Sequence, residues 1–293
     1  MFAVRNERVS LSRKAEANVP LWASSFYSLF GINPPTEELI VFPELLSLRA
    51  VTICPDESAV FASTIDFNRG AGLASRYAPV TSVEIASNFD IGSDSSAKIV
   101  YFLVLALKIV LNSSIQCPIA SSSSFNTILA AKEKTVKYVP FEDFPEMVSI
   151  SSASTVEGSD LEWIQKHLTG MIKMASGSII SNRFILATEL LFVWSYTKSH
   201  RMALMTLWSA IDAIFGKNER DIKRRMADRV SAFIPTFTHD DFCKAYEDRC
   251  SVVHGRKIND QDLNTALVYA KSLVSAALIA IIETSQAPLP DWE

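Results

Sequence analysis

The 293-residue sequence has few of the residues that mark disulfide-rich, collagen-like or membrane proteins. Its four cysteines include no C-x-x-C pair, so we expect reduced thiols rather than a disulfide framework. Nine glycines and twelve prolines exclude a collagen-like or low-complexity chain, and 48% hydrophobic residues exclude general disorder. Charges interrupt the first twenty positions, and the longest apolar runs are shorter than the roughly 18 residues of a membrane span. We therefore expect a globular, cytoplasmic protein with no signal peptide and no membrane partner.

The sequence also lacks a strong charge of either sign and the common catalytic motifs. Its 28 Lys and Arg residues and 32 Asp and Glu residues give a net charge of -4, which does not favour a nucleic-acid partner for the chain as a whole. No G-x-S-x-G, H-E-x-x-H, Walker A or G-x-G-x-x-G motif is present. Any site for a polyanion must therefore be local.

The two halves of the chain differ in their patterns. Short runs typical of β-strands occur up to about residue 155, at 38–42, 59–67, 82–86 and 135–139. Among them, the stretch from about Ser96 to Leu111 is apolar on nearly all sides, which predicts a helix buried against a sheet. A polar, serine-rich segment follows, and after it the strand signals stop. We predict an α+β domain over residues 1–155 and a helical domain over residues 156–293.

The helical domain is expected to contain six helices that begin near residues 159, 180, 201, 218, 238 and 259. Asn218, Thr238 and Asn259 are the expected N-caps of the last three. Gly216 is expected to end the third helix in the left-handed conformation, and Gly255 ends the fifth. Because the connections are short, successive helices should form an antiparallel bundle.

The fifth helix contains Arg249 and His254 in an R-x4-H arrangement, within YEDRCSVVHG at 246–255. Roughly 0.2 such pairs would arise by chance in this chain, so the pair needs context. Two further stretches supply it, namely LWSAIDAIFG at 207–216 and the basic helix DIKRRMADRVSAFI at 221–234. In this order the three stretches resemble the HEPN superfamily of all-helical nucleases, and within it the Apea-like branch, over roughly residues 160 to 285. The predicted fold is then an α+β N-terminal domain followed by an all-α, HEPN-type antiparallel helical bundle.

The resemblance implies a metal-independent endoribonuclease that needs no cofactor. Family members that cut RNA use the Arg and His of the motif, often with an acidic residue of an earlier helix, which implies catalytic roles for Arg249, His254 and Asp212. The residue types suit the chemistry. Cleavage requires a base that takes the proton of a ribose 2'-OH and a fixed cation that stabilises charge on the phosphate oxygens. Histidine titrates near neutral pH, and a guanidinium stays charged and can bind two oxygens.

The spacing of the motif bears on how the site is assembled. Five residues at ~100° each place the Arg249 and His254 side chains about 140° apart on a straight helix. They can meet at one phosphate if the helix unwinds before Gly255, or if two protomers contribute one residue each. The family is known for dimers of this kind. We therefore expect a homodimer with the cleavage site at or near its twofold axis.

Positive charge is concentrated beside the motif. From Lys198 to Arg229 there are eight basic and four acidic residues, a local net charge of +4 in a chain whose remainder carries -8. Such clustering is typical of a groove that binds phosphates. A solvated helix face with ion pairs such as Arg224 to Asp228 is the alternative. In the first interpretation, the residues expected to bind RNA are Lys217, Arg220, Lys223, Arg224 and Arg256.

A metal site on the fifth helix is not predicted. His239, Cys243, Cys250 and His254 share one side of this helix, and their types suit zinc. The two pairs lie about 16 Å apart along the axis, however, so one helix cannot bring all four to one ion. Small buried thiols are the ordinary explanation.

Two functions remain open. The first is a dimeric, metal-independent endoribonuclease, acting as a toxin or anti-phage effector whose N-terminal domain senses a trigger or restrains the nuclease. Its partners would be RNA and an antitoxin or trigger protein. The second is a non-catalytic bundle of the same design that dimerises and holds an RNA, a nucleotide or a protein.

Overall fold

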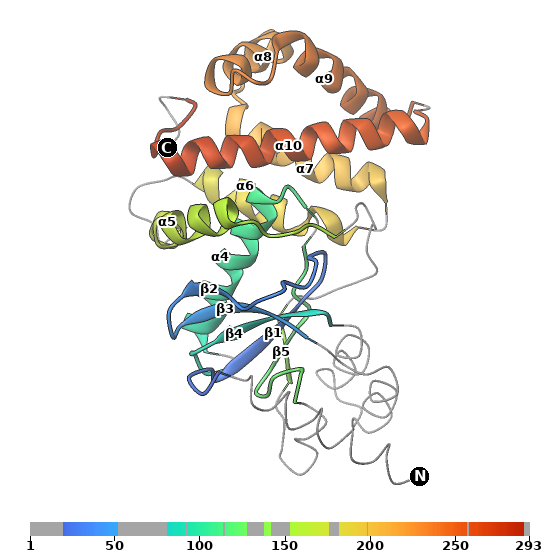
Figure 1. Cartoon of the computed structure of the whole chain (residues 1–293). Coiled ribbons are helices and arrows are strands. Elements are labelled where there is room, and N and C mark those ends of the chain that lie inside the picture. The colour runs from blue at the N-terminus through green and yellow to red at the C-terminus, as the bar shows by residue number, and fades with distance from the viewer. Residues whose placement is uncertain are drawn as a thin grey trace. The chain divides into compact units, whose positions relative to one another are not determined.

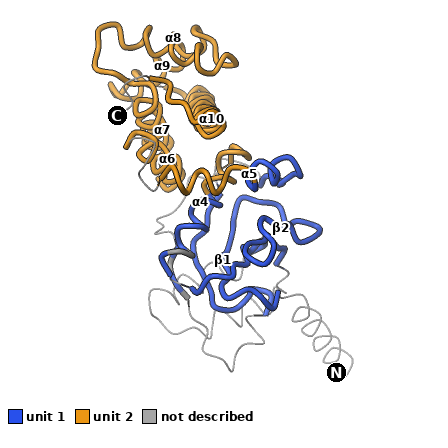
Figure 2. Tube along the Cα trace, turned by 90° about the vertical axis from the view of Figure 1, so that its left-hand side faces the viewer, with its two compact units in different colours: residues 1–104, 115–143, 152–165 blue, residues 105–114, 144–151, 166–293 orange. Residues whose placement is uncertain are grey.

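The computed structural model describes residues 20–51, 81–91, 93–113, 115–127, 138–141, 153–175, 182–197, 199–256 and 258–289. The chain forms two compact units, shown in different colours in Figure 2. Unit 1 comprises residues 1–104, 115–143 and 152–165, and unit 2 comprises residues 105–114, 144–151 and 166–293. The predicted order, a sheet first and helices afterwards, is confirmed. The units are not continuous in sequence, so a single cut at residue 155 divides the chain only approximately.

Unit 1 is built on one antiparallel sheet of six strands in the order β2-β3-β4-β1-β5-β6 (Figure 1). The central strands β1 and β4 are buried at every position, whereas the edge strand β2 is partly exposed. The strands are β1 (Ser25–Leu29), β2 (Leu39–Phe42), β3 (Leu46–Ala50), β4 (Val83–Ser87), β5 (Ile119–Ser121) and β6 (Tyr138–Pro140).

Three of the predicted strand runs have a counterpart in this sheet. The runs at 38–42 and 82–86 correspond to β2 and β4, and the end of the run at 135–139 lies in β6. The run at 59–67 lies outside the described residues. Strands β1, β3 and β5 were not among the predicted runs. All three contain buried serines, which interrupt the apolar pattern that identifies strands in a sequence.

A buried ion pair joins β3 and β4. Arg49 lies opposite Glu84 in the register of the two strands, and its Nη1 donates to the Glu84 carboxylate at 3.1 Å. The hydroxyl of Ser124 and the backbone N–H of Phe125 also donate to Glu84, each at 2.8 Å. Burial raises the pKa of Glu84, while Arg49 and these hydrogen bonds oppose the rise. The cluster fixes the segment after β5 to the centre of the sheet.

Helices account for most of unit 2, and the division between the units falls within the first two of them. The described helices are α4 (Asp94–Val110), α5 (Gly158–Ala175), α6 (Asn182–Val193), the 3-10 turn η3 (Trp194–Tyr196), α7 (His200–Phe215), α8 (Ile222–Phe233), α9 (His239–Val253) and α10 (Asp260–Thr284). The apolar helix predicted from Ser96 to Leu111 is confirmed as α4, whose residues 102–109 are buried.

Helix α7 forms the centre of the core of unit 2. It contacts α6, η3, α8, α9 and α10, and eight of its residues are buried. The guanidinium of Arg183, near the start of α6, donates to the carbonyl oxygen of Gly216 at 2.7 Å, just after α7 ends. The two helices are therefore antiparallel. Figure 1 shows α8 and α9 together at one end of this unit.

Two of the three predicted N-caps are confirmed. The Thr238 hydroxyl accepts the Asp241 N–H at 3.1 Å, and the Asn259 amide oxygen accepts the Asp262 N–H at 2.8 Å. The Asn218 cap was wrong, because the chain turns through Asp221 in the left-handed conformation before α8 begins. The prediction for Gly216 was also wrong. This residue has an extended backbone, with φ of -74° and ψ of 140°.

Two of the described lysines of unit 2 are buried. The Lys108 ammonium, on α4, donates to the Phe192 carbonyl at 2.8 Å and lies 3.8 Å from the centroid of the Phe192 ring. Lys271 of α10 is only 8% exposed, and its nearest aromatic partner is Trp194, at 5.9 Å. Burial lowers the pKa of Lys271, and no carboxylate among the described residues forms an ion pair with it.

Helix α10 is long and apolar enough, by length and composition, to span a membrane. It is 25 residues long, and 61% of its most apolar window is buried inside the protein. A core helix has the same properties, so the helix is weak support for a membrane span.

Candidate functional site

The R-x4-H motif occupies the C-terminal part of α9 and the turn that follows it. The helix ends at Val253, and His254 is its C-cap residue. Gly255 has a φ of 66°, its N–H donates to the carbonyl of Val252, and the N–H of Arg256 donates to that of Ser251 at 2.8 Å. These two bonds form a Schellman motif, which explains the glycine.

The position of this helix end fixes the angle between the two residues of the motif within the chain. Because Val253 is still helical, the backbone places the Cβ atom of His254 where a regular helix would place it, about 140° around the axis from Arg249. The chain unwinds only at Gly255, one residue too late to bring the two side chains together. Within one protomer, Arg249 and His254 therefore point in different directions.

The structure does bring together Arg249 and Asp212, which lie 37 positions apart in the sequence. Asp212 projects from α7, and its Oδ2 lies 3.5 Å from Nη2 of Arg249 on α9. The Asp212 side chain is 42% exposed and that of Arg249 is 23% exposed, so the pair lies at the border of the core and the surface. Burial raises the pKa of Asp212, and the neighbouring Arg249 charge lowers it.

Arg249 also rests on an aromatic cluster. Its guanidinium carbon lies 5.5 Å from the centroid of the Tyr246 ring. Tyr246 in turn meets the buried Trp208 of α7 edge to face, with centroids 5.6 Å apart, and Phe242 meets the same indole at 5.5 Å. Burial raises the pKa of Tyr246. The place of Trp208 beside Tyr246 depends on the packing of α7 against α9.

His254 and Arg256 are exposed. Among the described residues, the His254 imidazole has no hydrogen bond or ion pair. The guanidinium of Arg201, at the start of α7, approaches the carbonyl of Arg256 at 3.4 Å. The first turn of α7 therefore lies beside the turn that follows the motif.

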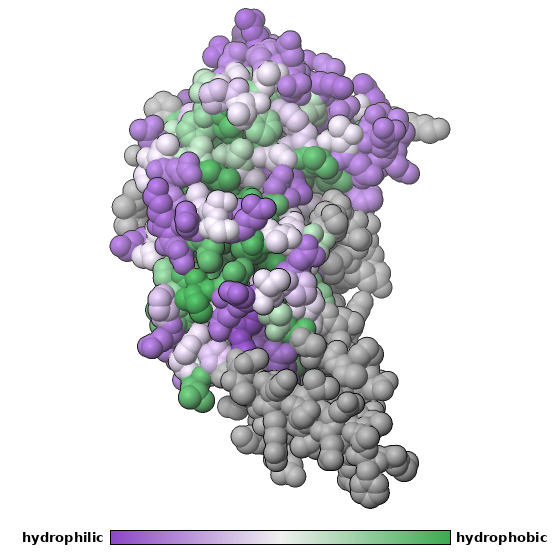
Figure 3. Space-filling model, viewed as in Figure 1, coloured by the Kyte–Doolittle hydropathy of each residue, from purple (hydrophilic) through white to green (hydrophobic). Residues whose placement is uncertain are grey.

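The predicted RNA-binding residues of α8 and the preceding loop differ in their surroundings. Lys223 forms an ion pair with Glu247 of α9 at 3.0 Å, and the hydrogen bond and charge of Glu247 raise its pKa. Lys217, Arg220 and Arg224 are exposed, and within the described part of the chain neither arginine has an ion pair. Figure 3 shows a largely hydrophilic surface over α8 and α9.

Other charges of α8 are compensated within the unit. Glu219 contacts both Arg225 and Arg229, and Nη1 of Arg229 also donates to the Phe215 carbonyl at 3.0 Å. Asp228 approaches His239 at 3.6 Å, and no ion pair joins it to Arg224 in the described residues. Glu219 had not been singled out in the sequence, and Glu247 pairs with Lys223. No sequence spacing identifies such partners, because they depend on how the loop and helices pack.

No cluster of three or more potential metal ligands occurs among the described residues. In the candidate zinc set, Cys243 Sγ lies 3.9 Å from His239 Nδ1, one turn apart on α9. This contact is a pair within a single helix. It does not supply the four ligands of a structural zinc site.

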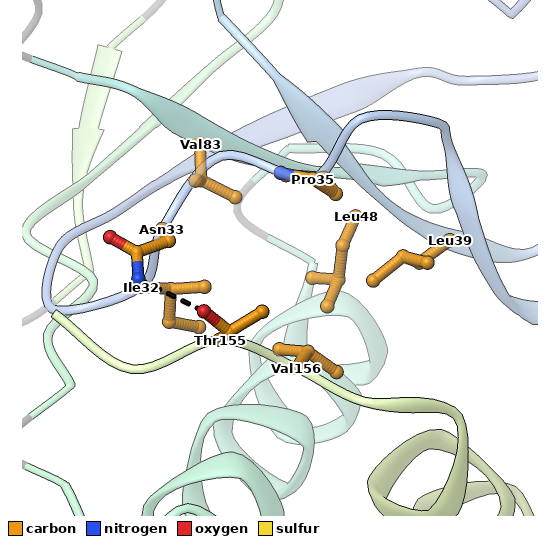
Figure 4. Close-up of a pocket in the computed structure, with 8 residues that line it drawn as sticks. All are labelled: Ile32, Asn33, Pro35, Leu39, Leu48, Val83, Thr155 and Val156. Carbon is orange, nitrogen blue, oxygen red and sulfur yellow. Dashed lines mark hydrogen bonds between the residues drawn. The ribbon is translucent and has the colours of Figure 1, made fainter.

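Unit 1 contains a small pocket that none of the predicted site residues lines (Figure 4). Its walls are mostly apolar, and its polar side chains are an amide and a hydroxyl. The Asn33 amide donates to Thr155 Oγ1 at 3.0 Å. With no titratable side chain on its walls, the pocket offers no acid, base or nucleophile. The lining residues are Ile32, Asn33, Pro35, Leu39, Leu48, Val83, Thr155 and Val156.

No protein-family model matches the chain, and neither the curated proteins nor the solved structures compared with it include a match. The function is therefore inferred from the motif, from the contacts of its residues and from the resemblance stated above.

Proposed function

We propose that this chain is a metal-independent endoribonuclease of the HEPN type that acts in the cytoplasm as a toxin or anti-phage effector. The observation that carries the proposal is the contact between Arg249 and Asp212. The resemblance assigns both residues to one site, and they lie 3.5 Å apart although they come from different helices. The positions of Arg249 and Asp212 in the sequence do not by themselves require this contact.

The reaction is transesterification of an RNA phosphodiester. His254 takes the proton of a ribose 2'-OH, which attacks the adjacent phosphorus atom. The P–O5' bond breaks, the protonated His254 gives its proton to the leaving 5'-oxygen, and a 2',3'-cyclic phosphate remains. Arg249 stabilises the negative charge that develops on the non-bridging oxygens. Asp212 orients Arg249 before the substrate arrives.

A homodimer is part of the proposal, because one protomer does not direct Arg249 and His254 to the same place. A twofold axis near the end of α9 lets Arg249 of one chain face His254 of the other. Exposed apolar side chains at the end of α9 and the start of α7 suit such an interface. Val253 is 44% exposed, and Met202, beside Arg201, is 58% exposed.

RNA binding is assigned to Lys217, Arg220, Lys223, Arg224 and Arg256. Arg220 and Arg224 are the strongest of these, because each is exposed and lacks a carboxylate partner among the described residues. Replacing both by Gln should weaken RNA binding and lower the slope of log Kd against log salt by roughly 1.4 to 1.8. Arg225→Gln is the matched control, since Glu219 already compensates Arg225.

The second candidate is a non-catalytic dimeric module that binds RNA, a nucleotide or a protein. Internal charge compensation favours it. Lys223 is paired with Glu247, and Arg249 is paired with Asp212, so part of the basic cluster can serve the fold alone. In either case, residues 1–155 would sense a trigger or restrain the bundle, and an antitoxin or trigger protein would be the partner.

Cleavage of total cellular RNA by the purified full-length chain in EDTA tests the proposal. Wild type is compared with Arg249→Ala and His254→Ala at matched dimer content. His239→Ala, at the other end of α9, is the control for loss of an imidazole. Cleavage that persists in EDTA, leaves cyclic phosphate ends and disappears only in the first two variants is the expected result. Binding without cleavage would favour the second candidate.

A further inference from the structure

The guanidinium of Arg249 has few polar contacts in its own protomer. Its Nε atom is buried and has no hydrogen-bond partner, and no nitrogen of the group donates to an acceptor among the described residues. The Asp212 contact, at 3.5 Å, is long for a charge-assisted hydrogen bond. Polar contacts alone therefore do not fix the plane of this guanidinium.

The ring of Tyr246 is the extended surface against which the guanidinium lies. Tyr246 precedes Arg249 by three residues, so the two side chains share one face of α9. The distance of 5.5 Å between the guanidinium carbon and the ring centroid is within the range of a cation–π contact. A ring in this place restricts the guanidinium, so that Nη2 faces Asp212 and Nη1 is left to meet an anion.

The ring is held in place from the other side. The Trp208 indole is fully buried and stands at 90° to the Tyr246 ring, with centroids 5.6 Å apart. Phe242, one turn earlier on α9, packs against Trp208, and its ring centroid lies 6.2 Å from that of Tyr246, but it forms no cation–π contact with Arg249 among the described residues. A rigid core residue of α7 thus supports Tyr246, and Tyr246 supports Arg249.

We propose that Tyr246 is a positioning residue for Arg249: its ring, supported by Trp208, holds the guanidinium in the direction needed to meet an RNA phosphate. The inference deepens the proposed function and rests on it. The aromatic ring performs the role, and the phenol hydroxyl takes no part in it. Tyr246 touches no reacting atom, so its effect passes through Arg249 alone.

Two substitutions at residue 246 separate the ring from the hydroxyl. Tyr246→Phe keeps the ring and should leave kcat within about twofold of wild type, with an unchanged pH profile. Tyr246→Leu removes the ring and should lower kcat roughly fivefold to tenfold, with a smaller change in KM, as expected for loss of a cation–π contact of ordinary strength. Phe242→Leu is the matched control, because it removes a ring from the same cluster without touching Arg249.

A measurement without RNA makes the test independent of the proposed function. In protein labelled with 15N-arginine, the Nε–Hε signal of Arg249, assigned by its loss in Arg249→Lys, should exchange slowly with water because the atom is buried. Slow exchange should persist in Tyr246→Phe and Phe242→Leu and be lost in Tyr246→Leu.

The outcomes are distinct. If wild type cleaves no RNA, the nuclease proposal fails and the exchange experiment alone decides whether Tyr246 positions Arg249. Unchanged exchange in Tyr246→Leu would overturn the inference whatever the activity. An equal loss of kcat in Phe242→Leu and Tyr246→Leu would also overturn it, since the cluster would then act only through general packing.

Discussion

Alanine substitution should stabilise unit 2 at one of its glycines and destabilise it at two others, and the structure gives a different reason at each position. Gly170 lies inside α5, and no atom lies within 4 Å of the position that an added Cβ would take. Gly216 has an ordinary φ, but an added Cβ would lie 2.3 Å from the backbone oxygen of Asp212. Gly255 has open space around it, but its φ is +66°.

The expected magnitudes follow from these differences. Gly170→Ala should stabilise the unit by about 0.5–1 kcal/mol, because alanine is the better helix former. Gly216→Ala should destabilise it by about 1–3 kcal/mol through overpacking, since the Asp212 carbonyl that must move also accepts the Gly216 N–H at 2.8 Å. Gly255→Ala should destabilise it by about 1–2 kcal/mol, the penalty of a left-handed conformation.

Urea denaturation followed by tryptophan fluorescence measures these changes, since Trp194 and Trp208 are both buried in unit 2. Thermal midpoints should shift by roughly 2–5 °C per kcal/mol for a unit of this size. A Gly216→Ala protein as stable as wild type, or more stable, would refute the close approach at the end of α7. A stable Gly255→Ala protein would contradict the Schellman motif at the end of α9.

Three further predictions concern buried or capping groups. Lys271→Met should stabilise the protein at pH 7. It should also remove a rise of wild-type stability with pH. Because burial lowers the pKa of Lys271, the unfolded chain binds more protons than the folded protein between that lowered pKa and 10.5. Equal pH dependence in both proteins would contradict this. Glu84→Gln should lower the stability of unit 1 by about 3 kcal/mol in urea, because it removes the nearer counter-charge of the buried Arg49, whose other carboxylate partner, Glu38, lies 3.8 Å away; a loss under 1 kcal/mol would show that the Glu84 charge is not needed. Asn259→Ala should lower the thermal midpoint by an amount equivalent to about 1 kcal/mol, and Asn259→Ser should restore most of it.

Local signals in the sequence predicted local structure well where one residue type decides the outcome. Thr238 and Asn259 cap their helices as predicted, because a short polar side chain before an apolar periodic run satisfies the first free N–H groups. Gly255 follows the end of α9, near the predicted place, and its φ of 66° is the conformation that favours glycine. Gly216 also follows a helix, but here the close approach of its backbone to Asp212 explains the glycine. The sequence alone does not distinguish a glycine needed for a left-handed backbone from one needed for a close approach.

Features that depend on contacts between distant parts of the chain could not be predicted from the sequence. The order of the strands and the pairing of Arg49 with Glu84 follow from how six short segments assemble. The place of residues 105–114 in unit 2 is not marked by any change of composition, since α4 is apolar on both sides of the division. The spacing of the motif gave the angle between Arg249 and His254, but the contact of Arg249 with Asp212 needed the packing of α7 on α9.

In the proposed dimer, two protomers complete one ribonuclease site, with Arg249 from one and His254 from the other. Mixing the inactive variants Arg249→Ala and His254→Ala tests it directly. After random exchange of subunits at equal amounts, half of the dimers are mixed and each has one intact site, so about a quarter of wild-type cleavage should return. No recovery in a mixture shown to contain mixed dimers, while wild type cleaves RNA, would contradict the shared site.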